Sequence, residues 1–176
     1  MPPKSTPKRL IAFLILIAAV APSVRTVASE EAAPPGHFIV VTIPDGWERR
    51  NGLADPVVLA AVERGIGDSF GLLAFKQPDG KFTLNRKSAE TGLLNEIGPT
   101  GKILRRADTR LVGVAAYCLI AETQVQGRNV SLARIMTERP VNGFIYAVQY
   151  SKMAGGDFDD AAIQAIIDRV HLKGSK

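Results

Sequence analysis

The sequence predicts an α+β class: a single domain with an antiparallel β-sheet flanked by helices, as in an α/β/α-type sandwich. Four strand-like runs within residues 102–151 are joined by connections that are too short for parallel neighbours. The run over residues 144–150 is apolar on both faces, and such a strand needs a covering layer on each side of the sheet. Two segments with helical spacing, residues 88–97 and 157–170, are able to supply these layers.

The first 29 residues predict a secretory signal peptide. Three basic residues precede an unbroken apolar run, residues 10–21, and small residues follow up to Ser29. The run is shorter than the roughly 20 apolar residues that a membrane-spanning helix needs. We therefore expect export by a Sec-type signal to a periplasmic or secreted location, with cleavage after Ala28 or Ser29. A retained membrane anchor is the alternative.

The charge balance argues against a nucleic-acid partner. The whole chain has 22 basic and 17 acidic residues, but four of the bases and none of the acids lie in residues 1–29. The rest of the chain therefore keeps 18 bases against 17 acids. Binding to nucleic acid needs a basic surplus that displaces counterions from phosphates. We expect no nucleic-acid partner.

The domain itself is expected over residues 37–173. Residues 30–36, which contain two consecutive prolines, predict a short flexible segment that leads into it. A β-branched run over residues 37–43 predicts the first strand, and the Pro-Asp-Gly tripeptide at residues 44–46 predicts a turn after it.

A β-hairpin is expected next. Residues 57–64 and 69–77 are two apolar runs joined by a glycine-rich loop. A helix is the alternative for the first run, because Asp55 is able to cap it and Pro56 would occupy its first position. We prefer the strand.

A helix and then a meander of four strands follow. The helix is expected over residues 88–97, where three apolar residues share one face and Gly98 ends the segment. Turn signals separate the four strands at Gly113, residues 126–129 and residues 140–143. The last of these contains Asn-Gly, the strongest short-range hairpin signal.

The final element is expected to be a helix. Asp157 is predicted as its N-cap, and Arg169 and His171 suit the negative end of its dipole. One apolar stripe at helical spacing must be buried against the sheet. It consists of Phe158, Ala162, Ile163, Ile166, Ile167 and Val170.

Two short motifs and the order of elements point to a known family. The opening Phe38-Ile-Val-Val-Thr-Ile-Pro-Asp-Gly-Trp47 is a strand followed by Pro-x-Gly-Trp, and Asn142 to Tyr146 form an Asn-Gly-x-x-Tyr hairpin. With the C-terminal helix and its short tail, this resembles the Mog1/PsbP-like superfamily, including its bacterial secreted members, over nearly all of the chain after the signal peptide. The resemblance implies a domain that binds other proteins, such as photosystem subunits or a small GTPase, and has no common catalytic apparatus. It also implies a structural role for Trp47, with a ligand platform as the alternative.

A serine hydrolase is a remote alternative. Residues 67–71 match Gly-x-Ser-x-Gly, and Ser69, Asp157 and His171 follow the chain order of α/β-hydrolases. That motif places its serine between a strand and a helix, whereas the run after Ser69 is too short for a helix. We therefore predict that the chain is not an enzyme.

Neither a metal nor a cofactor is expected, and the single cysteine is interpreted as structural. The two histidines lie near opposite ends of the domain, and no Cys or His pair has the spacing of metal ligands. Cys118 shares a face with Ala116 and Ile120 in a strand that is apolar on both faces, so we expect it to be buried.

One surface could bind a partner. Strict alternation along the strand over residues 102–111 places Lys102, Arg106, Asp108 and Arg110 on one face. The three bases are candidates for contact with an acidic partner. The alternative is a solvated edge strand whose charges discourage pairing with other strands.

The sequence therefore predicts a secreted, non-catalytic protein-interaction module of the cell envelope, with an envelope protein as its partner. Contact with a membrane is expected only through an uncleaved signal segment. A carrier of a small apolar ligand is the alternative function, because strands that are apolar on both faces can line a ligand site as well as pack a core.

Overall fold

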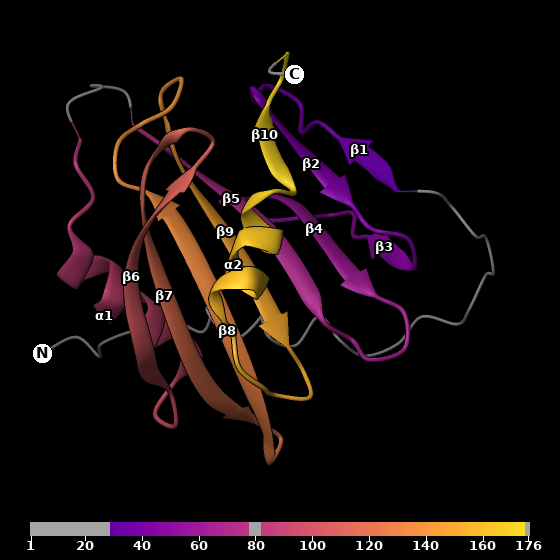
Figure 1. Ribbon diagram of the computed structural model, residues 1–176, viewed down its shortest axis with the longest axis vertical. Helices are drawn as coiled ribbons and strands as arrows, with labels where there is room; N and C mark the ends of the chain where they lie inside the picture. The colour runs from indigo at the N-terminus through magenta and orange to yellow at the C-terminus, as the bar shows by residue number, and fades with distance from the viewer. Residues whose placement is uncertain (1–28, 78–81, 175–176) are drawn as a thin grey trace, which may run out of the picture.

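The computed structural model describes residues 29–77 and 82–174. These residues form ten strands in two antiparallel sheets and two helices, in one domain (Figure 1). The predicted α+β class is therefore confirmed. Nearly all of the predicted signal peptide lies outside the described residues. Neither helix of the described part is long and apolar enough to cross a membrane.

The larger sheet has seven strands in the order β3-β4-β5-β9-β8-β7-β6. Each neighbouring pair is antiparallel, as the short connections predicted for the strands within residues 102–151. The strands are β3 (Trp47–Arg49), β4 (Val57–Glu63), β5 (Ser69–Lys76), β6 (Lys102–Leu111), β7 (Val114–Val125), β8 (Arg128–Thr137) and β9 (Phe144–Lys152). The strand predicted over residues 57–64 is thus confirmed, and the alternative helix there is wrong.

A smaller sheet of three strands, in the order β1-β2-β10, lies in front of the large one in Figure 1. Its strands are β1 (Glu30–Ala32), β2 (Ile39–Ile43) and β10 (Val170–Leu172). The prediction of a flexible segment over residues 30–36 is therefore wrong for its first three residues. They pair with β2, and Ala32 is buried in the core, so backbone hydrogen bonds and apolar contact both fix them.

The helix α1 (Arg86–Ile97) covers the face of the large sheet that is opposite to the small sheet. It begins two residues before the predicted start, because the Asn85 side chain accepts a hydrogen bond from the backbone N–H of Ser88 at 3.0 Å. It ends at Gly98, whose φ of 81° favours glycine.

The second helix, α2 (Asp160–Ile167), is shorter than the sequence predicted. Its N-cap is Asp159, which accepts from the N–H of Ala162 at 2.7 Å, and not Asp157. Arg169 and His171 do not lie in its last turn, because the chain leaves the helix at Asp168 and pairs with β2 as β10. The prediction that they complement the helix dipole is therefore wrong.

Two apolar cores lie on the two faces of the large sheet, as the doubly apolar strand predicted. Along β9, Tyr146 and Val148 belong to the core under α2 and the small sheet, whereas Ala147 belongs to the core under α1. Leu93 and Ile97 are the buried residues of α1. The helix α1 thus covers one face of the large sheet, and α2 together with the small sheet covers the other.

Candidate functional site

The strand β6, which carries the candidate bases, forms one edge of the large sheet. Ile103 lies opposite Ala121 on β7, but Arg105 lies opposite the next residue, Ile120, so Leu104 is an extra residue in a β-bulge. Directly opposed residues in an antiparallel pair share a face, and the bulge therefore shifts the alternation by one residue.

This bulge corrects the predicted arrangement of the bases. Arg106, Asp108 and Arg110 share the α1 face of the sheet, as predicted. Lys102 lies on the other face, opposite Glu122, so the predicted face with four charges is wrong for this residue.

Two salt bridges neutralise bases on the α2 face of β6. The ammonium of Lys102 lies 2.6 Å from the carboxylate of Glu122, and the Arg105 guanidinium lies 3.0 Å from that of Asp160 in α2. Both pairs are largely exposed, so each adds little stability. They do affect binding, because an acidic partner would have to compete with Glu122 for Lys102 and with Asp160 for Arg105.

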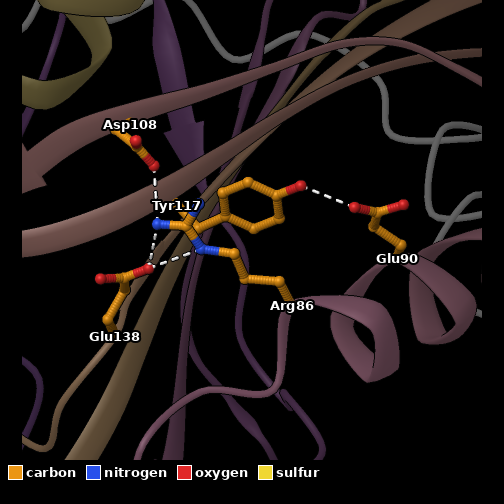
Figure 2. A network of polar contacts seen from close by, with 5 residues as sticks. All are labelled: Arg86, Glu90, Asp108, Tyr117 and Glu138. Carbon is orange, nitrogen blue, oxygen red and sulfur yellow. Dashed lines mark hydrogen bonds and ion pairs between the residues drawn. The ribbon is translucent and has the colours of Figure 1, made fainter.

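On the α1 face, Arg86 joins the start of the helix to β6, to β7 and to Glu138, the residue after β8 (Figure 2). Its Nη2 lies 2.6 Å from Oδ1 of Asp108, and its Nε donates to Oε1 of Glu138 at 2.8 Å. The guanidinium carbon is 4.6 Å from the ring centroid of Tyr117, which is a cation–π distance. Asp108 is therefore already occupied by an internal cation.

Glu90 in α1 pairs with Arg106, the second of the predicted bases. Its carboxylate accepts from the Tyr117 hydroxyl at 2.6 Å, as Figure 2 shows, and from Nη2 of Arg106 at 2.9 Å. The hydrogen bonds from Arg106 and then from Tyr117 lower the pKa of Glu90. Burial raises the pKa of Tyr117, and the bond to Glu90 adds to this. Arg106 thus serves to fix α1 on the sheet.

Arg110 is the predicted base that stays available. It is exposed and, within residues 29–77 and 82–174, has no acidic group within salt-bridge distance. It also lines an open groove of about 960 Å³. The structure therefore separates the three candidate bases, and Arg110 alone is positioned to meet a partner's charge.

The groove borders β6, an edge strand of the large sheet. It is lined by three consecutive strand residues, Asp108, Thr109 and Arg110, whose side chains alternate between the two faces of the sheet. Such a lining fits a groove at the outer edge of the strand, because the inner edge is occupied by β7. The same reasoning applies to β10, which lines the opposite wall with residues 170–172 and pairs with β2 on its other edge.

The remaining walls of the groove come from α2 and from the turn between β6 and β7. Gln164 and Asp168 line it from the helix, and Val112 and Gly113 from the turn. Val112 has a φ of 48° and Gly113 a φ of 82°, so this tight turn places both residues in the left-handed region. The lining is mixed, with charged, amide and aliphatic side chains.

Trp47 makes the contacts of a packing residue. Its ring centroid lies 5.6 Å from that of Tyr150, and the guanidinium of Arg169 lies 5.6 Å from the centroids of both rings. These contacts connect β3 and β9 of the large sheet to the chain between α2 and β10. The structural role of Trp47 stays a prediction, because Trp47 also lines a small cavity.

Cys118 and Ser69 show no reactive geometry. Cys118 is 1% exposed, as predicted, and burial raises the pKa of its thiol to about 11. Ser69 is the first residue of β5 and lies opposite Val62 and Ser151, in a strand that continues to Lys76. The strand-to-helix turn that a hydrolase serine needs is therefore not formed there. The described residues contain no cluster of acidic, His or Cys side chains that could hold a metal ion.

Sequence reasoning missed the partners of the candidate bases. Arg86 and Glu90 are four residues apart in α1, and this spacing places both on the same side of the helix. The helix predicted over residues 88–97 contains Glu90 but not Arg86, so the sequence indicated the position of Glu90 alone. The wall formed by α2 and β10 had no such signal, because it depends on where the end of the chain packs.

The fold has known counterparts, although neither the models of protein families nor the curated proteins give a match. The solution structure of a cyanobacterial PsbP, CyanoP from Synechocystis, has a TM-score of 0.60 at 10% identity, covering 88% of this chain and 98% of that one. The Ran-binding protein Mog1p of Saccharomyces cerevisiae has a TM-score of 0.57 at 10% identity, covering 82% and 95%.

Two bacterial structures are also similar. LpqN of Mycobacterium tuberculosis, described as involved in cell envelope biogenesis, has a TM-score of 0.55 at 16% identity, covering 82% of this chain and 90% of that one. A Bacteroides thetaiotaomicron protein has a TM-score of 0.55 at 10% identity over 84% of this chain, which spans about half, 49%, of its length. The chain has the Mog1/PsbP-like fold.

Proposed function

We propose that this chain is a non-catalytic protein-interaction module of the cell envelope, and that it binds its partner in the groove between β6 and the α2–β10 segment. The observation that carries this proposal is the groove itself. It lies between two strand edges and contains Arg110, the candidate base that has no acidic partner among the described residues.

The structural neighbours support an interaction module. Mog1p is named as a Ran-binding protein, and LpqN is described as involved in cell envelope biogenesis. The predicted signal peptide agrees with an envelope location. No residue of a neighbour's binding site is transferred to this chain, because the proposal depends on the groove of this structure alone.

The open shape of the groove favours a protein over a small apolar ligand. Pockets for small ligands bury most of the ligand's surface, whereas this groove is open. Here Asp108, Arg110, Asp168 and His171 all contribute to the walls, and a second cavity near Trp47, of about 260 Å³, is also lined by charged side chains. The doubly apolar strands, which suggested a carrier, are used to pack the two cores.

The test is site-specific photo-crosslinking in the native envelope fraction. A benzophenone side chain replaces Gln164 in the groove wall or, as a control, Gln124 near the β7–β8 turn. We expect one discrete adduct from position 164 and none from position 124. The adduct should be lost with Arg110→Glu and kept with Arg128→Glu, the same charge change near the control position.

Two results would contradict the proposal. Equal adducts from both positions would mean that the groove is not the docking surface. No adduct from either position, in the fraction where the protein resides, would remove the interaction module as its function.

A further inference from the structure

Resting on this proposed function, we infer that the partner supplies an extended acidic segment that adds to the outer edge of β6 as an eighth strand of the large sheet. The segment would lie in the groove, where its backbone pairs with β6. Its acidic side chains would meet Arg110.

The four edges of the two sheets differ in length, and this difference singles out β6. The outermost strands β1, β3 and β10 each have three residues, whereas β6 has ten. A short edge offers few unpaired backbone groups to an incoming strand, which is one way in which proteins avoid edge-to-edge association. The length of β6 leaves the largest exposed edge among the described residues.

The outer edge of β6 is free of backbone partners in the described part of the chain. β7 is its sole neighbour in the sheet, and no backbone hydrogen bond from a loop or a helix reaches residues 102–111. The bulge at Leu104 disturbs the regular pattern of N–H and C=O groups in the first part of the strand. The regular stretch available for pairing is therefore residues 106–111, of which residues 108–110 line the groove.

The charges of β6 determine which kind of strand can pair with its outer edge. Arg110 is the base of β6 that stays unpaired among the described residues, so a second copy of the same edge would add another unpaired base and no free acid to meet it. This disfavours a dimer formed through β6. An acidic strand would instead be attracted, and Arg110 needs no internal contact to be broken before it pairs with a carboxylate.

Strand addition fits the geometry of the groove better than side-chain contact alone. Main-chain hydrogen bonds supply affinity in this mode, and alternate side chains supply specificity. One face of an added strand would continue the α1 face, where Arg110 lies, and the other would face α2 and β10.

The test is an NMR titration of the ¹⁵N-labelled protein with a blocked hexapeptide of alternating Glu and Val, at concentrations up to the millimolar range. We expect shifts and slowed amide exchange within residues 106–111. A Lys-Val peptide should bind at least about fivefold more weakly, because like charges would face β6. A Glu-Val peptide that is N-methylated along one edge keeps its charge but loses the donors for pairing, and it should not bind.

Matched variants locate the charge contact. Arg110→Glu should weaken binding of the Glu-Val peptide by about fivefold to tenfold, and Arg128→Glu should leave it unchanged. Both residues are exposed on strands, so neither change disturbs a core, and circular dichroism checks the fold.

The outcomes separate this inference from the proposed function. A crosslinked partner at position 164, without any response of residues 106–111 to the peptide, would overturn strand addition and leave the docking groove in place. Equal binding of the N-methylated peptide would overturn strand addition as well. A dimer that pairs through β6 in solution would overturn the acidic partner.

Discussion

The buried ion pair between Arg134 in β8 and Glu96 in α1 allows a quantitative test of how the helix is held on the sheet. The Arg134 side chain is 8% exposed and that of Glu96 is 17% exposed. Nη2 of Arg134 lies 2.7 Å from both carboxylate oxygens, and its Nε donates to Oε1 of Gln149 at 2.9 Å. The guanidinium therefore depends on these two acceptors to replace most of the hydrogen bonds that it would make with water.

Removing one partner of such a pair is expected to cost more than removing both. Glu96→Leu would leave the more deeply buried Arg134 charge with Gln149 alone, and should lower the free energy of unfolding by about 3 kcal/mol. Arg134→Leu should cost about 2 kcal/mol, because Glu96 is the more exposed partner and is able to turn toward water. The double variant removes both charges and should come within about 1 kcal/mol of the original protein.

Urea unfolding of the four proteins gives these values and the coupling between the two sites. For a domain of this size, the change in Glu96→Leu corresponds to a loss of roughly 6–12 °C in Tm. Glu122→Leu, which removes the acid of the exposed pair with Lys102, is the control and should change stability by less than about 0.5 kcal/mol. Additive costs in the double variant, or a cost below about 1 kcal/mol for Glu96→Leu, would refute the reasoning.

Three further predictions test other parts of the structure. Burial raises the pKa of each of the three tyrosines, that of Tyr150 to about 12, so phenolate absorbance at 295 nm should rise at a higher pH in the native protein than in urea. Because the neutral phenol is favoured, the associated stability is present below pH ~10 and is lost as the pH rises through the folded pKa values. Burial raises the pKa of the Cys118 thiol to about 11. This cysteine should therefore react with a disulfide reagent at pH ~8 when the protein is unfolded in urea, and should not react when the protein is folded. Rapid reaction of the native protein would contradict the burial of Cys118. Gly101→Ala would place a Cβ in steric overlap with Cγ1 of the buried Ile97, and should lower the free energy of unfolding by about 1–3 kcal/mol in the same urea assay. An unchanged midpoint would mean that Ile97 moves aside freely.

The elements that the sequence predicted well are those whose signals are local. The Asn142-Gly143 pair lies in the turn between β8 and β9, and both residues adopt positive φ angles. The alternation of two apolar sets along β9 correctly required cover on both faces of the sheet. In each case the residues that decide the structure are neighbours in sequence.

The end of the chain shows where local signals stop being sufficient. Asp157 and Asp159 are equally suitable caps by residue type, and the choice between them depends on how α2 packs. Val170 continues the apolar stripe of the helix, so periodicity alone extends the helix through it. Its pairing with Val41 is a contact with the other end of the domain, which no nearby residue indicates.

The arrangement of charges in the candidate site was predicted wrongly for a similar reason. Alternation assumes an uninterrupted strand, and nothing in residues 103–105 marks Leu104 as the extra residue of a bulge. The acids that pair with Arg106 and Lys102 come from α1 and β7, so their effect required the tertiary structure. Alternation does place Arg134 among apolar residues of β8, and this conflict was an available signal for a buried partner such as Glu96.

These corrections change how the charges of β6 are interpreted. If the strand were only protected from association, its bases would be most effective when unpaired and spread along the edge. Instead, the pairs to Glu122, Asp160 and Glu90 neutralise the bases at and just after the bulge, and Arg110, farther along the regular stretch, remains unpaired among the described residues. A purely protective edge does not explain this distribution. An edge that rejects its own copy and accepts an acidic strand at one end does explain it.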